Sequence, residues 1–311
     1  EQDRLTLSLN IIEKLALDKV IKNWTGFGIA LQAYGKRSIN VIHWINKILD
    51  KREKMHLRLV KGAYWDYEIK HAQVFGYEDY PVYSKKSLTD ISFLLCAKEI
   101  LKNEKIYAKF ATHNAHTISS VHQLGQGKDY EFQRLYGMGE LLYQSAEKVL
   151  NLEKKPSVYA PIGSYKDLLP YLVRRLLENG ANSSFINRLL DPETDANWLA
   201  ENPAIRIEKE KIDIPLPKNI FTERKNSSGF DLSENSNLEN LEKSISAHKK
   251  NKINAESIYV NRDEKEKVGQ KVYSIANNEE IGTAIFDDPT NVKSALENFA
   301  SEKWSKYSVQ E

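Results

Sequence analysis

Short apolar runs alternate with longer helical patterns along the first 190 or so residues of the chain. The first helical pattern lies at 4–22, where Leu5, Leu9 and Ile12 recur at helical spacing. Five strand-like runs follow it, at about 27–33, 56–60, 107–112, 131–135 and 157–160. Further helical patterns lie between or after these runs, at 39–50, 88–102, 115–124, 139–150 and 165–179. This alternation is typical of repeated βα units over a parallel sheet.

The predicted fold class is therefore α/β, with about five of the eight βα units of a TIM barrel. A closed barrel would need three more strands, and we expect those to precede residue 1. Beyond Pro192 the pattern weakens, and the Ser- and Asn-rich stretch 221–256 resembles a solvated linker that we expect to be exposed and poorly packed. Alternation returns at 269–285, and a helix is predicted over 291–304.

The composition narrows the function classes. The net charge is +2, from 45 basic and 43 acidic residues, so no basic field for nucleic acid is expected. The one cysteine, Cys96, excludes an internal disulfide and suits a reducing cytosol, and its apolar neighbours indicate a core residue. No apolar run approaches the roughly 18 residues of a membrane span, and the charged segment 1–4 is unlike a signal peptide.

The helical segment 165–179 carries a narrow polar side flanked by leucines, and Gly180 follows it at the usual terminating position. The polar residues fall at i, i+3, i+4 and i+7: Tyr171, Arg174, Arg175 and Glu178. One interpretation is a surface ladder of ion pairs, worth a few tenths of a kcal/mol. The other is a pair of planar guanidinium groups that grip one carboxylate from a sheltered position.

The strand at 56–60 runs into a glycine turn. Period-two alternation places His56, Arg58 and Val60 on one face and the leucines on the other. In a parallel barrel Arg58 would then point inward, where a charge needs a ligand, water or a carboxylate. The alternative is an exposed edge strand with a harmless arginine. The long aromatic-rich connection at 61–86 is of the kind that often carries function.

A strand end meets a helix start in the segment 110–116. Thr112 or Asn114 is a plausible helix cap, and the same strand end could equally face a flavin or a phosphate group. His113 and His116 have no third ligand at a recognisable spacing, so no metal is expected. The Gly137-Met138-Gly139 turn lacks the third glycine of a dinucleotide fingerprint.

Five ordered motifs resemble the proline dehydrogenase domain of bifunctional proline-utilisation enzymes. They are RLVKGAYWD at 58–66, FATHN at 110–114, YGMGE at 136–140, YAPIG at 159–163 and YLVRRLLENGAN at 171–182. The resemblance covers roughly 1–195, which would be the C-terminal half of the barrel. A weaker resemblance links 257–311 to the opening of an aldehyde dehydrogenase module, with 196–256 as the linker between them.

The resemblance implies FAD-dependent oxidation of L-proline to pyrroline-5-carboxylate, by hydride transfer to flavin N5. The second module of that family oxidises glutamate semialdehyde with NAD. A quinone or membrane electron acceptor is implied, together with a cytoplasmic location or a peripheral one at the inner face of the membrane.

The resemblance also implies roles for particular residues. Arg174 and Arg175 would clamp the proline carboxylate, with Glu178 orienting them. The walls around the pyrrolidine ring would be Tyr171, Tyr159, Leu135 and Tyr64. The FAD contacts would be Gln32, Arg58, Val60, Lys61, Gly62, Ala63, Trp65, Thr112, His113, Asn114, Ser184 and Phe185, with Arg58 at the reactive edge of the flavin.

The chain also departs from the family pattern. It lacks the strand with an acidic pair, the active-site lysine, the catalytic cysteine region of the aldehyde dehydrogenase and the DNA-binding module of some members. A rival hypothesis is therefore a catalytically silent remnant, or a subunit completed by a separate N-terminal chain or by a homo-oligomer. A third is an unrelated phosphate-binding barrel enzyme.

Overall fold

The computed structural model describes residues 2–180, 195, 197, 200–210, 214–249, 251–256 and 269–299, with only the backbone at 176–180 and 298–299. Two compact units make up the chain, residues 1–234 and 235–311. Ser184 and Phe185, both expected as cofactor contacts, lie outside the described residues. The side chain of Glu178 lies outside them too.

The first unit is built on a parallel sheet of five strands in the order β1-β2-β3-β4-β5. Its strands are β1 Gly28–Gln32, β2 Met55–Val60, β3 Ile106–Ala111, β4 Tyr130–Leu135 and β5 Ser157–Tyr159. Each strand is hydrogen-bonded to the next along the chain, so every connection crosses over in the manner of a βα unit. The predicted five parallel strands are confirmed.

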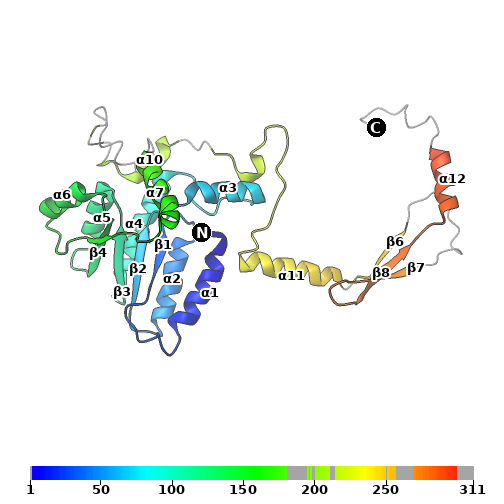
Figure 1. Ribbon diagram of the computed structural model, residues 1–311, viewed down its shortest axis with the longest axis horizontal. Helices are drawn as coiled ribbons and strands as arrows, with labels where there is room; N and C mark the ends of the chain where they lie inside the picture. The colour runs from blue at the N-terminus through cyan, green and yellow to red at the C-terminus, as the bar shows by residue number, and fades with distance from the viewer. Residues whose placement is uncertain are drawn as a thin grey trace. The chain divides into compact units, whose positions relative to one another are not determined.

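Helices follow the strands in sequence (Figure 1). Those of the first unit are α1 Leu5–Ala16, α2 Ser38–Leu49, α3 Trp65–Phe75, α4 Lys86–Lys102, α5 Ala115–Leu124, α6 Glu140–Leu150, α7 Tyr165–Gly180 and α10 Pro203–Lys209, with short 3-10 turns η1 Gln2–Arg4 and η2 Pro217–Asn219. The prediction that 61–86 is a long loop was wrong in part, because α3 occupies its middle. This helix buries Ile69 and Ala72 and ends at Gly76, whose φ of 62° is left-handed.

The predicted first helix was also too long. It ends at Ala16 rather than near residue 22, because the buried Arg52 ties the following turns to the start of β2. Arg52 Nη1 donates to the Ala16 carbonyl at 3.0 Å and Nη2 donates to the Trp24 carbonyl at 2.7 Å. These bonds satisfy a helix-end carbonyl from outside the helix.

The core lies between the sheet and its helices. In β2 and β3, buried and half-buried residues alternate strictly, as the pattern at 56–60 predicted. The buried set from the strands includes Leu57, Leu59 and Phe110, which pack against Ile42 of α2 and Phe93 of α4. Burying each such side chain contributes roughly 1.5–3 kcal/mol. The opposite face of the strands carries polar side chains, among them Arg58, Lys109 and Gln133.

Part of the predicted linker 196–256 is structured. Its first part belongs to the first unit, where α10 packs against α4. Its second part contains α11 Asn235–Lys249 and β6 Ile253–Glu256. No described residue between 221 and 256 is buried, so the expected exposure of that stretch is confirmed although its helix was missed.

The second unit contains a small mixed sheet. Strands β7 Gly269–Tyr273 and β8 Glu280–Ile285 pair antiparallel, and β6 pairs parallel to β8. They match the alternation predicted at 269–285. The helix predicted at 291–304 is α12 Pro289–Phe299.

Candidate functional site

The carboxyl ends of parallel strands meet at one edge of a sheet, and that edge gathers most of the predicted site residues. They stand at the ends of β1 to β5 or directly after them: Gln32, Arg58, Val60, Lys61, Gly62, Ala63, Tyr64, Trp65, Thr112, His113, Asn114, Leu135 and Tyr159. Tyr171, Arg174 and Arg175 come from α7, which follows β5. The site is therefore assembled from consecutive βα connections of the first unit.

Arg58 lies on the face of β2 that turns away from the helices. Its Nε donates to Oε1 of Gln133 on β4 at 2.8 Å. Its guanidinium carbon lies 5.0 Å from the centroid of the Tyr159 ring, a cation–π distance. The edge-strand alternative does not apply, because β2 is paired on both sides and Arg58 is half-buried.

The two arginines of α7 each lie over a tyrosine from the predicted set. Arg175 lies over Tyr171 at 5.3 Å, and Arg174 over Tyr64 at 5.2 Å. Both arginines are half-buried. Among the described apolar residues of α7, Leu169 is 58% exposed and Leu172 is 46% exposed, whereas each arginine has its guanidinium over a tyrosine ring.

Tyr159 connects the strand side of this cluster with the helix side. Burial raises the pKa of its phenol, and the charges of Arg58 and Arg175 partly offset that effect. A hydrogen bond with Tyr171 raises the pKa further. Arg175, Tyr171, Tyr159 and Arg58 are thus brought together at one edge.

His113 is held neutral at the end of β3. Burial, followed by the charges of Arg175, Arg134 and Arg58, lowers its pKa to about 4. Nε2 of the ring accepts a hydrogen bond from the Leu135 amide at 3.2 Å. A neutral imidazole whose Nε2 accepts must carry its proton on Nδ1. His113 therefore presents a donor, and no extra positive charge, to whatever binds at this edge.

The turn after β2 is fixed by several contacts. Gln32 Oε1 accepts from the Ala63 amide at 3.2 Å, and Lys61 forms an ion pair with Asp90. Gly62 has a φ of 143°, and a Cβ at this position would lie 2.3 Å from the ring of Tyr34. Only glycine fits this close approach.

The neighbouring contacts complete the edge. Trp65 Nε1 donates to the Tyr83 carbonyl at 2.8 Å. Thr112 is buried, and its carbonyl accepts from the Tyr143 hydroxyl at 2.8 Å. Asn114 caps α5 by accepting from the Thr117 amide at 3.0 Å. The capping interpretation of Asn114 is therefore correct, and it is compatible with a role at the edge.

The donors present fit a flavin, whose ring system offers carbonyl oxygens and a nitrogen as acceptors. The guanidinium of Arg58 has five N–H groups, and among the described residues only one of them has a protein acceptor, Gln133. The neutral His113 adds a second donor from the next strand. Gly62 also packs closely on the ring of Tyr34. Because glycine has no side chain, no side-chain atoms cover the turn at this position.

Sequence reasoning missed the polar partners of Arg58. Gln133, Glu131 and Lys109 lie on the same face of the sheet, and they are linked by hydrogen bonds and an ion pair. Their alternation along β3 and β4 was a usable signal, since the same period-two argument identified Arg58. The register between the strands cannot be predicted from a local pattern.

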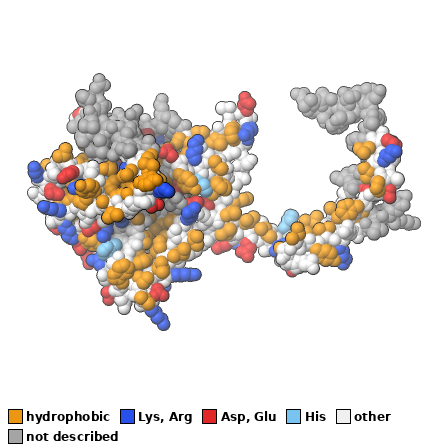
Figure 2. All heavy atoms as spheres, in the orientation of Figure 1, with side chains coloured by type: hydrophobic (Ala, Val, Ile, Leu, Met, Phe, Trp, Pro, Cys, Tyr) orange, Lys and Arg blue, Asp and Glu red, His pale blue; other side chains and the backbone are white. Residues whose placement is uncertain are grey.

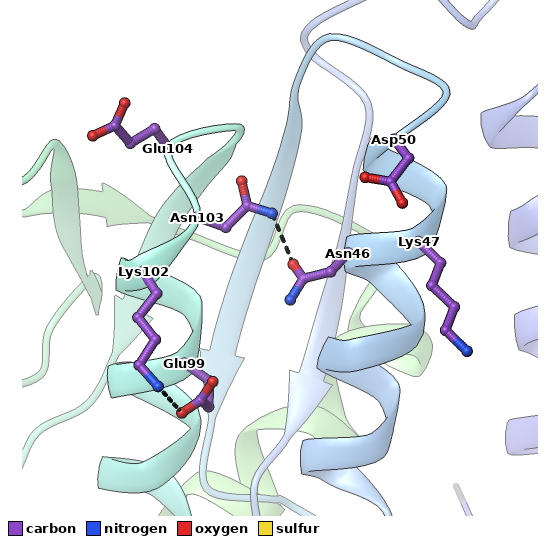
Figure 3. A pocket seen from close by; sticks show the side chains of 7 residues that line it. All are labelled: Asn46, Lys47, Asp50, Glu99, Lys102, Asn103 and Glu104. Carbon is purple, nitrogen blue, oxygen red and sulfur yellow. Dashed lines mark hydrogen bonds and ion pairs between the residues drawn. The ribbon is translucent and has the colours of Figure 1, made fainter.

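A surface pocket lies at the other end of the sheet (Figure 3). It is formed by the C-terminal turns of α2 and α4, and its lining residues are Asn46, Lys47, Asp50, Glu99, Lys102, Asn103 and Glu104. Lys102 pairs with Glu99, and Asn103 donates to Asn46 at 2.8 Å. Four of the lining residues thus form two pairs, and the pocket is remote from the strand ends that gather the predicted site.

Metal clusters and membrane spans are both absent from the described ranges. No group of three or more His, Cys, Asp or Glu side chains is arranged to hold a metal ion there. No helix in the same ranges has the length and apolar character needed to cross a membrane. Cys96 is fully buried, and burial raises the pKa of its thiol to about 11.

Comparison with known proteins assigns the chain to a family. The sequence profile of the family described as proline dehydrogenase matches residues 1–188. The bifunctional protein PutA of Klebsiella aerogenes is 44% identical over 265 residues, covering 79% of this chain and 20% of the relative. The chain thus spans about a fifth of the length of that relative.

Two solved structures are similar to this chain in sequence and in fold. Proline utilization A from Bradyrhizobium japonicum, in a mutant form, is 41% identical with a TM-score of 0.75, covering 84% of this chain and 27% of that one. Proline utilization A from Bdellovibrio bacteriovorus, inactivated by N-propargylglycine, is 25% identical with a TM-score of 0.81. The latter likeness covers 99% of this chain and 32% of that one.

Proposed function

Because the chain belongs to the proline dehydrogenase family, we propose that it forms part of an enzyme that oxidises L-proline to pyrroline-5-carboxylate with bound FAD. One observation supports this most. Two arginines of α7, each over a tyrosine, share the strand-end edge with Arg58 and a neutral His113. That combination suits a small amino acid with a free carboxylate beside a planar cofactor.

In this proposal the arginines bind the substrate. Arg174 and Arg175 would grip the proline carboxylate through planar guanidinium forks, which match its two oxygens. Tyr64 and Tyr171 hold the guanidinium planes by cation–π contact. The rings of Tyr171, Tyr159 and Tyr64, with the side chain of Leu135, would form the walls around the pyrrolidine ring and exclude water.

FAD, when bound, would supply the redox chemistry by accepting a hydride from the carbon beside the proline nitrogen. The chain supplies positioning. Arg58 and His113 would donate to acceptors on the flavin ring, and the turn at 60–65 would take its remaining contacts. With a pKa of about 4, His113 remains a neutral donor at physiological pH.

The test is a flavin titration of the purified chain followed by anaerobic addition of L-proline. Flavin should bind with a shifted visible spectrum, and proline should bleach it. D-proline serves as the matched control. If the arginines held its carboxylate in the same place, its ring would turn the wrong hydrogen toward the flavin. An absence of flavin binding both for the chain alone and for the chain supplemented with an N-terminal half-barrel would refute the proposal.

The second candidate function is a half-barrel that is active only with a separate partner segment. Among the described residues, β1 and β5 each pair with one strand only. Apolar side chains are exposed on α1 and α7, including Leu7 at 62%, Ile11 at 49% and Leu169 at 58%, and Figure 2 shows hydrophobic side chains on the surface of this unit. Flavin binding that appears only after the half-barrel is added would favour this version.

The second unit supports a further part of the proposal. We infer that 257–311 begins an NAD-dependent aldehyde dehydrogenase module, which would oxidise the semialdehyde formed from pyrroline-5-carboxylate. The likeness to the Bdellovibrio protein over 99% of the chain supports this. A quinone or membrane electron acceptor, with a cytoplasmic or peripheral membrane location, belongs to the same proposal. Reduction of a soluble quinone analogue by the proline-reduced protein would test the acceptor.

A further inference from the structure

We infer that Gln133 and Glu131 are positioning residues for Arg58, acting in series across the inner face of the sheet. This inference rests on the proposed function, because Arg58 is expected to face the flavin. The series has two links. Gln133 Nε2 donates to Glu131 Oε1 at 2.8 Å, and Gln133 Oε1 accepts from Arg58 Nε at 2.8 Å.

The carboxylate decides which way the amide of Gln133 points. An ionised carboxylate only accepts hydrogen bonds, so the NH₂ group of Gln133 must face Glu131. The carbonyl oxygen of the same amide is then turned toward Arg58, which only donates. The opposite orientation would set oxygen against oxygen and N–H against N–H, so both links would be lost together.

Glu131 is held ionised by its other neighbours. Lys109 Nζ lies 3.3 Å from Oε1, and the Tyr107 hydroxyl donates to Oε2 at 3.2 Å. Burial alone would raise the pKa of Glu131, but the hydrogen bond from Gln133 and the charge of Lys109 outweigh burial and lower it. The side chain of Glu131 is only 15% exposed, so these interactions are partly sheltered from solvent.

The strand register makes the reach across β3 possible. Arg58 lies opposite Lys109, and Lys109 lies opposite Glu131, so these three residues form one layer. Gln133 belongs to the next layer, opposite Ala111 of β3. The methyl group of Ala111 leaves room for Arg58 to pass over β3 and meet Gln133 on β4.

The consequence for Arg58 is a fixed guanidinium plane. Gln133 uses the Nε–H, and the plane lies over the Tyr159 ring at 5.0 Å. An arginine held at two points loses most of its rotamer freedom before any ligand arrives, which is preorganisation. The four other N–H groups can then face the cofactor in a fixed direction.

The first experiment follows the Arg58 Nε–H by ¹⁵N NMR in the flavin-free chain, so it does not depend on the proposed activity. Gln133→Leu should speed hydrogen exchange at this group about tenfold, the factor that corresponds to one lost hydrogen bond. Glu131→Gln should speed it less, because the amide of Gln133 would no longer be oriented. Gln123→Leu, on the exposed side of α5, is the matched control and should have no effect.

A swapped pair tests the direction of the series. In the double variant Glu131→Gln with Gln133→Glu, a carboxylate at 133 still accepts from Arg58 and an amide at 131 still donates to it. Protection of the Arg58 Nε–H should therefore return, whether or not Gln133→Leu folds. Exchange that stays fast in the swapped pair, or stays slow in Gln133→Leu, would overturn the inference.

The second readout is flavin itself, in the chain supplemented with an N-terminal half-barrel. Glu131→Gln should weaken FAD binding a few-fold and shift the visible absorption bands, and the swapped pair should restore both. An unchanged FAD spectrum in Glu131→Gln would show that the series does not reach the cofactor. If the wild type takes up no flavin, the proposed function fails, and the NMR result still decides whether Gln133 and Glu131 position Arg58.

Discussion

The two faces of the five-stranded sheet are built from the same strands and have opposite properties. On the helix side, Leu57, Leu59 and Phe110 are at most 1% exposed and belong to the hydrophobic core cluster. On the inner side, Arg58 and Glu131 are half-buried and belong to a hydrogen-bonded series. Successive residues of one strand thus have different roles, because one stabilises the core and the next belongs to the candidate site.

The difference lies in what each face loses on substitution. Removing an apolar side chain from a packed core leaves a cavity, and the loss falls on the free energy of unfolding. Removing a polar partner on the inner face mainly lets the side chain that it held move. We therefore expect that side chain to lose its fixed orientation and ligand binding to weaken. Four substitutions, at Phe110, Arg175, His113 and Lys102, test this division.

The largest effect is expected on the helix side. Phe110→Ala should lower the free energy of unfolding by about 3–5 kcal/mol, because the ring is fully buried and packs on Phe93 and Phe132. Urea denaturation followed by circular dichroism measures this. Leu95→Ala, at a position 51% exposed on α4, is the control and should cost less than about 0.5 kcal/mol. Equal losses for the two variants would show that the helix side is not the main core.

The next effect concerns the strand-end edge and its proposed role in proline binding. In a chain completed by an N-terminal half-barrel, Arg175→Lys should weaken proline binding by about 1.5–3 kcal/mol while FAD stays bound. A planar fork would be replaced by a point charge that cannot hold both carboxylate oxygens. Steady-state kinetics give the affinity, and Arg224→Lys, on an exposed arginine of the same unit, is the control. Unchanged proline kinetics would leave only the surface-ladder interpretation of α7.

A smaller effect concerns pH. The pKa of His113 is about 4 in the folded chain, against an ordinary value near 6.5. Between these values the unfolded chain takes up a proton that the folded chain does not. The free energy of unfolding therefore falls as pH drops from about 6.5 to about 4. Below about 4 the histidine is protonated in both states, so its effect on the free energy of unfolding no longer changes with pH. Its contribution should be about 1–2 kcal/mol, reduced from the full shift by the partial exposure of the ring.

His113→Gln isolates that contribution, because glutamine does not titrate. The difference in unfolding free energy between wild type and variant should shrink as pH falls through this window. The variant His43→Gln, at an exposed site on α2, is the matched control. A difference that does not change with pH would show that His113 is not held neutral.

The smallest effect lies outside both faces. Lys102 and Glu99 form an exposed i,i+3 ion pair on α4 at 2.5 Å. Lys102→Ala should change the free energy of unfolding by less than about 0.5 kcal/mol, and the change should vanish in 1 M salt. Denaturation at two ionic strengths measures it, with the exposed Lys98→Ala on the same helix as the control. A loss above 1 kcal/mol would mean that charges beyond the sheet matter more than the comparison allows.

Much of the first unit could be predicted from periodicity. The five strands and most helices fall where alternation and helical spacing placed them, because each element has one face against the core. Helix α3 was missed because its apolar positions are few and its stability comes from packing against Tyr34 and Tyr80. The end of α1 was misplaced because Arg52, 36 residues away from Ala16, provides the terminating contact.

The site was partly predictable for a similar reason. Strand ends of a parallel sheet meet at one edge, so Arg58 and His113 could be placed together before any coordinates. The partner of Arg58 could not, since Gln133 lies 75 residues away and two strands over. The cation–π pairs of Arg174 and Arg175 likewise depend on how α7 packs, which its own sequence does not determine.

Helix α11 has a consequence for how long the chain survives intact. None of its residues from Asn235 to Lys249 is buried, so within the described residues its backbone hydrogen bonds are its main support. An isolated helix of that length is marginal in water and opens often. A protease that cleaves after lysine, of which this helix has two, should therefore cut the chain there far sooner than within the sheet of the first unit.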